Sequence, residues 1–241
     1  MVLVFTGGEH PSIPNTKQFI HTIKNSISTS LIKNNKQCKP HIIVADSGLS
    51  FCEKCGFVPD IICGDFDSLE EKYKQPKEEI TFFLQEKYPT STIQLWPKDK
   101  EYTDTEIALQ EAIKKRSPTK TSNDIILIGG DGGRSDHFFA NIKLFEKSIA
   151  PDYWLCKKQY IQVLKEGHTY NIQQQSEFSI FPIYTGKKNN HHIQSKNLMW
   201  NLDKLRWDRG IYSLGNRCLD TSKKANVIVH TGRFLFFAPY Y

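Results

Sequence analysis

The sequence has no long run of apolar residues. Nothing in it approaches the roughly 18 consecutive apolar residues that a membrane-spanning helix needs. The first residues, MVLVFTGGEHP, have too short an apolar run for a signal peptide, and no cationic segment precedes that run. We therefore expect a first strand at this end of the chain, no membrane association, and a soluble protein of the cytoplasm.

Patterns typical of zinc sites and of nucleic-acid binding are also missing. Cys52 and Cys55 form a C-x-x-C pair, but no second pair of cysteines or histidines completes a zinc site. We interpret them as buried, neutral thiols, with redox chemistry or half of a zinc site as the alternatives. No RRM-like, zinc-finger or basic-arm pattern occurs, so nucleic-acid binding would rest on charge alone. We expect no nucleic-acid partner.

The charge balance is mildly basic. Lys and Arg number 32 against 26 Asp and Glu, which gives a net charge of +6 spread along the chain. This excess favours an anionic partner, and a phosphorylated small molecule satisfies it as well as nucleic acid does. With 39% apolar residues, the 241-residue chain can build a core without disulfides.

Hydrophobic patterning divides the chain near residue 152. Residues 1–152 alternate short β-branched runs with longer helical patterns, which predicts an α/β domain with a parallel sheet and helices on both faces. Residues 153–241 contain short runs such as FSIFPIY and NVIVHTG between polar turns, which predicts an all-β domain. Ligands of a parallel sheet bind beyond the carboxyl ends of its strands.

Acidic residues follow three of the expected strands. They are Asp46, then Asp65 with Asp67, then Asp99, Glu101 and Asp104. Carboxylates gathered at one sheet edge would repel one another unless a hard cation neutralises them, and Mg²⁺ takes oxygen ligands that it often shares with phosphates. We expect Asp65 and Asp67 to project from one extended segment toward the same metal, with Gly64 keeping the approach open.

Helix capping is the alternative interpretation of these polar residues. Asp67, Thr103 and Ser135 all stand where a helix of the α/β domain is expected to begin, and a cap contributes about 1 kcal/mol. Any single acid is explained by capping, whereas acids at three strand ends favour a metal site.

The loop GGDGGRSDH, residues 129–137, follows the fifth expected strand. It lacks the G-K-[ST] of a P-loop and the spacing G-x-G-x-x-G. Its four glycines would let backbone N–H groups approach an anion, and Arg134 would add a bidentate phosphate donor. A plain glycine turn with a surface arginine is the alternative, and His137 is open as a proton carrier or a structural hydrogen-bond partner.

Taken together, the motifs resemble the thiamine pyrophosphokinase family. The resemblance rests on ADSG at 45–48, PDIICGDFDSL at 59–69, DKEYTDTE at 99–106 and GGDGGRSDH at 129–137, in that family's order and spacing. It continues through FSIFPI, LMWNL and YSLGN, and so covers nearly the whole chain.

The resemblance implies an α/β catalytic domain that binds ATP and Mg²⁺, a C-terminal β-sandwich that binds thiamine, and a homodimer with active sites between subunits. It implies transfer of the terminal diphosphate of ATP to the hydroxyethyl oxygen of thiamine, with AMP as the leaving group. No strong base is obvious. A nearby carboxylate could accept the alcohol proton, and the sequence does not select one.

The resemblance also implies residue roles. The expected Mg²⁺ ligands are Asp46, Asp65, Asp67 and Asp104. The expected ATP-binding residues are Asp46, Lys100, Thr103, Arg134, His137 and Asn141. The expected catalytic residues are Asp65, Asp67, Asp104, Arg134 and Asp136. The expected thiamine-binding residues are Trp200, which would stack on thiamine, with Ser213 and Asn216.

The sequence departs from the family pattern at four positions. Ser47 stands where a glycine is usual, Glu101 where an Asp is usual, and Gly215 where the second serine of S-x-S-N is usual. Asp131 adds a negative charge inside the glycine loop. The rival interpretations are a related Mg²⁺-dependent diphosphokinase acting on a pterin-like alcohol, a non-catalytic thiamine or nucleotide sensor, and a Mg²⁺-dependent phosphohydrolase.

Overall fold

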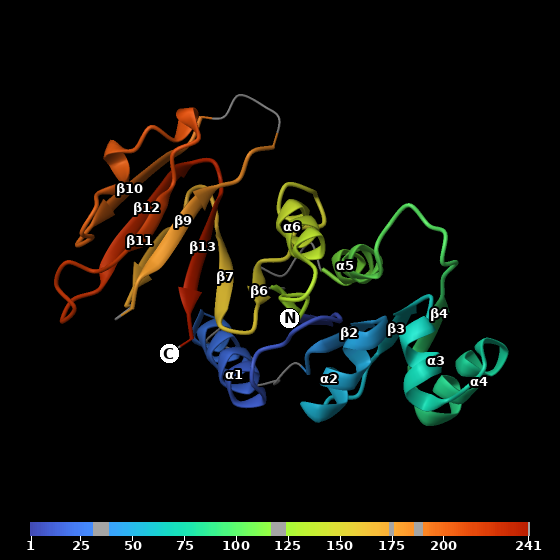
Figure 1. Cartoon of the computed structure of the whole chain (residues 1–241). Coiled ribbons are helices and arrows are strands. Elements are labelled where there is room, and N and C mark those ends of the chain that lie inside the picture. The colour runs from blue at the N-terminus through green and yellow to red at the C-terminus, as the bar shows by residue number, and fades with distance from the viewer. Residues whose placement is uncertain (31–38, 117–123, 174–175, 186–189, 241) are drawn as a thin grey trace. The chain divides into compact units, whose positions relative to one another are not determined.

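The computed structural model describes residues 1–30, 39–116, 124–173, 176–185 and 190–240 (Figure 1). The chain forms two compact units. The first contains residues 1–144 and 149–157, and the second contains residues 145–148 and 158–241. Within the described ranges, no helix is long and apolar enough to cross a membrane.

The first unit is built on a parallel sheet with the strand order β6-β5-β1-β2-β3-β4. The strands are β1 (Val2–Phe5), β2 (His41–Ala45), β3 (Ile61–Gly64), β4 (Thr92–Leu95), β5 (Ile125–Ile128) and β6 (Tyr153–Leu155). Every residue of β1, β3 and β5 is buried, as expected for strands covered on both faces.

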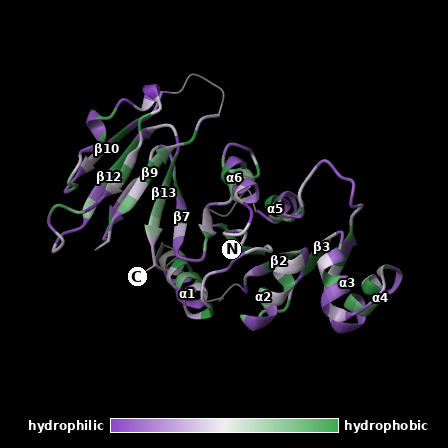
Figure 2. Ribbon diagram, in the orientation of Figure 1, coloured by the Kyte–Doolittle hydropathy of each residue, from purple (hydrophilic) through white to green (hydrophobic). Residues whose placement is uncertain are grey.

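Helices follow the strands and cover both faces of this sheet, as the alternating pattern predicts. They are α1 (Ile13–Ser30), α2 (Leu49–Lys54), α3 (Asp67–Tyr73), α4 (Lys77–Lys87), α5 (Asp104–Lys114) and α6 (Ser135–Leu144), with the 3-10 turn η1 (Asp46–Gly48). Helices α5 and α6 lie on one side of the sheet and α1 and α2 on the other (Figure 1). Figure 2 shows mixed hydrophobic and hydrophilic residues on α1 and α2, as expected for helices that cover a sheet.

The strand order reverses between β1 and β5. From β1 the chain proceeds through β2, β3 and β4 in one direction, and β5 and β6 then continue on the opposite side of β1. In open parallel sheets, ligands bind beyond the carboxyl ends of the strands at such a reversal. The glycine loop follows β5 and therefore lies at this point of the sheet.

The second unit contains two antiparallel sheets, with strand orders β11-β9-β13-β7 and β10-β12-β8. The strands are β7 (Gln159–Leu164), β8 (Thr169–Ile172), β9 (Phe178–Pro182), β10 (His192–Lys196), β11 (Ser213–Asn216), β12 (Ala225–Thr231) and β13 (Phe234–Pro239). The short turns are η2 (Leu202–Lys204) and η3 (Trp207–Arg209). Alternate residues of β10 and β12 are buried. The predicted fold class, an α/β parallel sheet followed by an all-β region, is confirmed.

A carboxylate of α2 joins three helices of the first unit. Glu53 lies 2.7 Å from Lys72 Nζ and 2.8 Å from Lys87 Nζ, and it accepts hydrogen bonds from the hydroxyls of Tyr73 and Tyr88. Partial burial alone would raise the pKa of Glu53, but the hydrogen bonds from Lys72, Lys87 and Tyr88 lower it to about 2. The cluster therefore ties α3 and α4 to α2.

Because the pKa of Glu53 is lower in the folded state than its usual 4.5, the cluster stabilises the fold above about pH 4.5 and loses this contribution as the pH falls toward 2. Allowing for solvent screening, we expect Glu53→Gln to remove about 1 kcal/mol of the unfolding free energy at pH 7 and little at pH 2. Urea denaturation at pH 7 and at pH 2 measures the unfolding free energy of the variant and of the unsubstituted protein. Glu86→Gln, at an exposed glutamate of α4, is the control, and an equal loss at both pH values would contradict the expectation.

Candidate active site

Three carboxylates converge at the carboxyl ends of β2 and β3. One oxygen from each of Asp46, Asp65 and Asp67 lies within 4.8 Å of the others. Asp46 and Asp65 are buried, whereas Asp67 is exposed. The structure thus brings together three of the four residues predicted as metal ligands.

Asp65 and Asp67 meet by a turn rather than along an extended segment, so the expected geometry was wrong. Phe66, between them, has a φ of 65° in the left-handed region and is completely buried, and Asp67 is the first residue of α3. Asp67 N–H lies 3.4 Å from Asp65 Oδ1. The buried aromatic ring holds the turn, because a left-handed residue other than glycine persists only where its surroundings fix it.

Gly64 allows the strand ends to approach closely. A Cβ atom at Gly64, whose φ is 148°, would lie 3.0 Å from Asp46 Cβ and 3.4 Å from Asp104 Oδ1. Asp46 itself has a φ of 40°, a second non-glycine residue in the left-handed region beside the cluster. The expectation that Gly64 keeps the approach open is confirmed.

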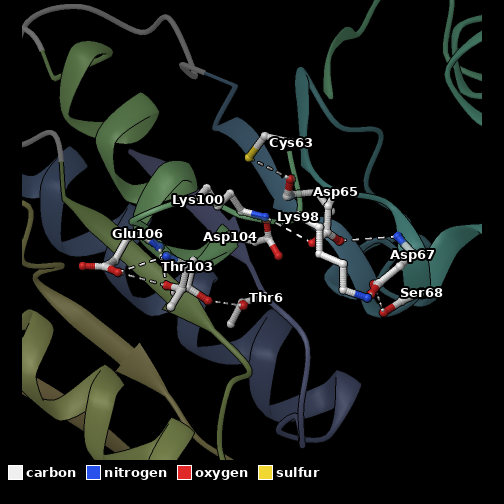
Figure 3. Close-up of polar contacts among 12 residues, drawn as sticks. Thr6, Cys63, Asp65, Asp67, Ser68, Lys98, Lys100, Thr103, Asp104 and Glu106 are labelled. Carbon is white, nitrogen blue, oxygen red and sulfur yellow. Dashed lines mark hydrogen bonds and ion pairs between the residues drawn. The ribbon is translucent and has the colours of Figure 1, made fainter. Parts of the chain in front are cut away.

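Asp104 is connected to the cluster through a lysine. Lys100 Nζ lies 3.2 Å from Asp65 Oδ2 and 3.1 Å from Asp104 Oδ1 (Figure 3). Burial raises the pKa of the Asp104 carboxyl, while the hydrogen bond from Lys100 opposes that rise. Lys98 lies 3.4 Å from the exposed Asp67. These ammonium groups neutralise part of the negative charge.

Asp46 has the environment expected of a metal ligand. Burial raises its pKa to about 6, and the charges of Asp104 and Asp67 add to the rise. Its Oδ1 atom is buried and has no hydrogen-bond partner. A buried, unsatisfied carboxylate oxygen is costly. An all-oxygen donor set with such an atom fits a hard divalent cation.

Two acids that follow β4 do not join the cluster. Asp99 and Glu101 are exposed on the loop between β4 and α5, so the expectation that all these acids meet was wrong for them. Thr103 caps α5 and forms a capping box with Glu106, which confirms the capping interpretation at this position. Asp67 does not cap α3, because the cap position is Phe66.

The glycine loop is held by a segment that the sequence analysis did not select, the residues that follow β1. Gly130 N–H donates to Gly7 O at 2.6 Å, and Glu9 N–H donates to Asp131 O at 2.6 Å. Thr6 links this segment to α5, because its hydroxyl lies 2.6 Å from the hydroxyl of Thr105. In the sequence, the residues TGG directly after the first expected strand could have indicated this segment.

Several backbone N–H groups of the glycine loop, which were expected to approach an anion, are therefore already hydrogen-bonded to protein atoms. Gly129 N–H donates to Leu155 O, and Gly132 N–H donates to the carboxylate of Asp131. Asp131 also accepts the backbone N–H of Lys157 at 2.9 Å. The extra charge at Asp131 thus stabilises the loop through hydrogen bonds, and the prediction that glycine N–H groups face an anion is wrong at Gly129, Gly130 and Gly132.

The remaining residues expected to contact ATP lie on the loop and on α6. Arg134 and Asp136 form an exposed, bidentate ion pair, with Arg134 Nη2 2.5 Å from Asp136 Oδ2. His137 is exposed. Asn141 is buried and donates to Gly130 O at 3.0 Å, so its amide supports the loop.

The three residues expected to bind thiamine lie together in the second unit. Trp200 is 51% exposed, which argues against a core role. Asn216 is completely buried and donates to Trp200 O at 2.9 Å and to Ser213 Oγ at 3.0 Å. Its Oδ1 atom accepts the N–H groups of Trp200 and Arg217. Asn216 therefore positions Trp200.

Asn216→Ala is expected to lower the unfolding free energy by about 2–4 kcal/mol, because it removes a completely buried amide together with its hydrogen bonds to the backbone of Trp200 and Arg217 and to the Ser213 hydroxyl. Chemical denaturation measures the loss. Asn226→Ala is the control, since Asn226 is on β12, in the other sheet of this unit, and its side chain bonds to the exposed Asn171. A loss no larger than that of the control would contradict the positioning role.

The cysteine pair and the hydroxyl of Ser47 are not part of the carboxylate cluster, although the backbone of Ser47 hydrogen-bonds to Asp46. Cys52 and Cys55 are buried and free. Burial raises the pKa of both thiols, that of Cys55 to about 11. They are therefore neutral thiols, as predicted. The Ser47 hydroxyl packs against Gly7, where any Cβ atom would clash with it.

Comparisons with known proteins agree with this arrangement. The model of the family "Thiamin pyrophosphokinase, catalytic domain" matches residues 32–155. A curated thiamine pyrophosphokinase of Bacillus subtilis is 30% identical over 135 residues, which cover 54% of this chain and 56% of that protein. The alignment thus spans about half the length of that relative.

Solved structures share the fold over the full chain. A thiamin pyrophosphokinase family protein from Enterococcus faecalis has a TM-score of 0.67 at 20% identity, and the match covers 100% of this chain and 99% of that one. Thiamin pyrophosphokinase from Candida albicans has a TM-score of 0.61 at 15% identity, with coverage of 100% and 88%. Because the family model matches just over half of the 241 residues, the chain belongs to the thiamin pyrophosphokinase family.

Proposed function

We propose that this protein transfers the terminal diphosphate of ATP to the hydroxyethyl oxygen of thiamine, with Mg²⁺, to give thiamine diphosphate and AMP. The observation that carries the proposal is the cluster of Asp46, Asp65 and Asp67 at the carboxyl edge of the sheet, in a member of this family. The buried, unpartnered Asp46 Oδ1 atom supports a cation there.

Each part of the first unit has a role in this proposal. Asp46, Asp65 and Asp67 would hold Mg²⁺, and Asp104 would support them through Lys100. When bound, Mg²⁺ would neutralise negative charge on the phosphates of ATP. Lys100 is 11% exposed between two carboxylates, so it is held in place beside the position proposed for the phosphates.

The glycine loop and α6 would contact ATP mainly through side chains. Arg134, which is exposed, is proposed to leave Asp136 and bind the transferred group through its two-pronged guanidinium. His137 lies in the first turn of α6, while Thr103 and Asn141 are proposed to shape the site as structural supports. Use of the bound N–H groups of the loop would require these hydrogen bonds to break.

The second unit would supply the thiamine pocket. The exposed indole of Trp200 offers stacking and a cation–π interaction of roughly 0.5–2 kcal/mol to a flat, cationic ligand. Ser213 and Asn216 would position it. We further propose a homodimer whose sites combine the metal acids of one subunit with Trp200 of the other, and a cytoplasmic location, where ATP is available.

Product analysis separates this function from its rivals. We expect incubation with ATP, Mg²⁺ and thiamine to yield thiamine diphosphate and AMP on an anion-exchange column. ADP or free phosphate would indicate another kinase or a phosphohydrolase, and no reaction despite thiamine binding would indicate a sensor. A pterin-like alcohol replacing thiamine as acceptor would indicate the related diphosphokinase. Any of these results would overturn the proposal.

A further inference from the structure

A cation of the protein already lies beside the exposed indole of the second unit. The guanidinium carbon of Arg217 is 5.7 Å from the ring centroid of Trp200. This is within the distance at which an aromatic ring attracts a cation. Trp200 remains 51% exposed, so a ligand that stacks on this ring does so next to a positive charge.

The backbone fixes the two residues next to each other. Asn216 Oδ1 accepts the N–H of Arg217 at 2.9 Å and the N–H of Trp200 at 3.3 Å. Since Asn216 is completely buried, these two hydrogen bonds to its side chain belong to the folded structure of this unit. The proximity of Arg217 and Trp200 is therefore set by the fold of this unit.

A carboxylate balances the charge of Arg217. Glu177 Oε1 lies 3.3 Å from Arg217 Nη1. A Cβ atom at Gly215, whose φ is 65°, would lie 3.4 Å from Glu177 Oε2. Arg217 therefore lies close to both the indole ring of Trp200 and the carboxylate of Glu177. The φ of 65° at Gly215 is a backbone conformation that favours glycine.

We propose that Arg217 determines which ligand charge the Trp200 pocket favours. Its positive charge weakens binding of the thiazolium cation of thiamine and strengthens binding of the phosphorylated, net anionic product. The carboxylate of Glu177 reduces both effects. The physical basis is the Coulomb interaction between charges a few ångströms apart, which salt screens. The proposal rests on the proposed function, because it takes Trp200 as the stacking partner of thiamine.

The test measures binding of three ligands by calorimetry in the presence of Mg²⁺ and without ATP. The ligands are thiamine, thiamine diphosphate and the neutral aminopyrimidine half of thiamine. We expect Arg217→Gln to tighten thiamine about three- to tenfold at low salt, to weaken thiamine diphosphate, and to leave the neutral fragment unchanged. Glu177→Gln should weaken thiamine. Lys223→Gln, at an exposed lysine paired with Asp220, is the control.

The outcomes are distinct. Opposite changes for thiamine in the two variants, which shrink as salt is raised, would support the proposal. Equal changes for all three ligands would mean that Arg217 only shapes the pocket, and unchanged affinities would mean that it is a surface residue. Either result overturns this inference while the proposed function stands. Failure of the unsubstituted protein to bind thiamine would overturn both.

Discussion

Asp65→Asn and Asp67→Asn are each expected to reduce turnover at least about a hundredfold while the protein stays folded. Each substitution removes a charged oxygen from the three-carboxylate cluster. Loss of groups that merely orient metal ligands costs 10–100-fold, so loss of a proposed ligand should cost at least the upper value. The measurement is the rate of AMP formation over a range of Mg²⁺ concentrations.

Asp99→Asn is the matched control for these variants, because Asp99 is an exposed acid on the loop after β4 and lies outside the cluster. Its activity should be close to that of the unsubstituted protein. Thermal melts followed by circular dichroism establish that all three variants are folded. Near-normal activity of Asp65→Asn or Asp67→Asn at low Mg²⁺ would contradict the metal assignment.

Mixed dimers of two inactive variants are expected to recover activity. If Trp200 of one subunit serves the metal acids of the other, a dimer of Asp65→Asn with Trp200→Ala has one site with both lesions and one site with neither. Random pairing makes about half of the dimers mixed, so recovery should approach about a quarter of the normal activity in the unfractionated mixture and about half in isolated mixed dimers. Co-expression with two different affinity tags isolates the mixed dimers for assay.

A second pairing makes this test specific. Asp65→Asn mixed with Asp67→Asn places a lesion among the metal acids of both sites, so these dimers should stay inactive. Isolated Asp65→Asn/Trp200→Ala dimers that form but remain as inactive as either parent would show that each subunit carries its own complete site.

The position of the acidic cluster could be predicted from the sequence because it follows from topology. Parallel strands end at a common edge, so Asp46 and Asp65, each directly after a buried apolar run, had to lie near one another. The cap of α5 at Thr103 could also be predicted, because a helix cap depends on residues that are close in sequence.

Features that depend on distant packing could not be predicted in this way. The left-handed turn at Phe66 depends on the complete burial of its side chain, which the neighbouring sequence does not show. The N–H of Gly130 is bonded by Gly7, more than a hundred residues earlier, and a glycine-rich sequence does not indicate which of its N–H groups are already used. Asn216 matched a ligand pattern, yet its amide is enclosed by backbone groups of its own unit.

Electron paramagnetic resonance of Mn²⁺, used in place of Mg²⁺, tests most directly the claim that the acids after β2 and β3 hold a divalent cation for ATP. We predict that the unsubstituted protein removes free Mn²⁺ from solution in a saturable manner, that ATP strengthens this binding, and that Asp65→Asn weakens it at least about tenfold while Asp99→Asn does not. Equal Mn²⁺ binding by the unsubstituted protein and by Asp65→Asn, with and without ATP, would contradict the account.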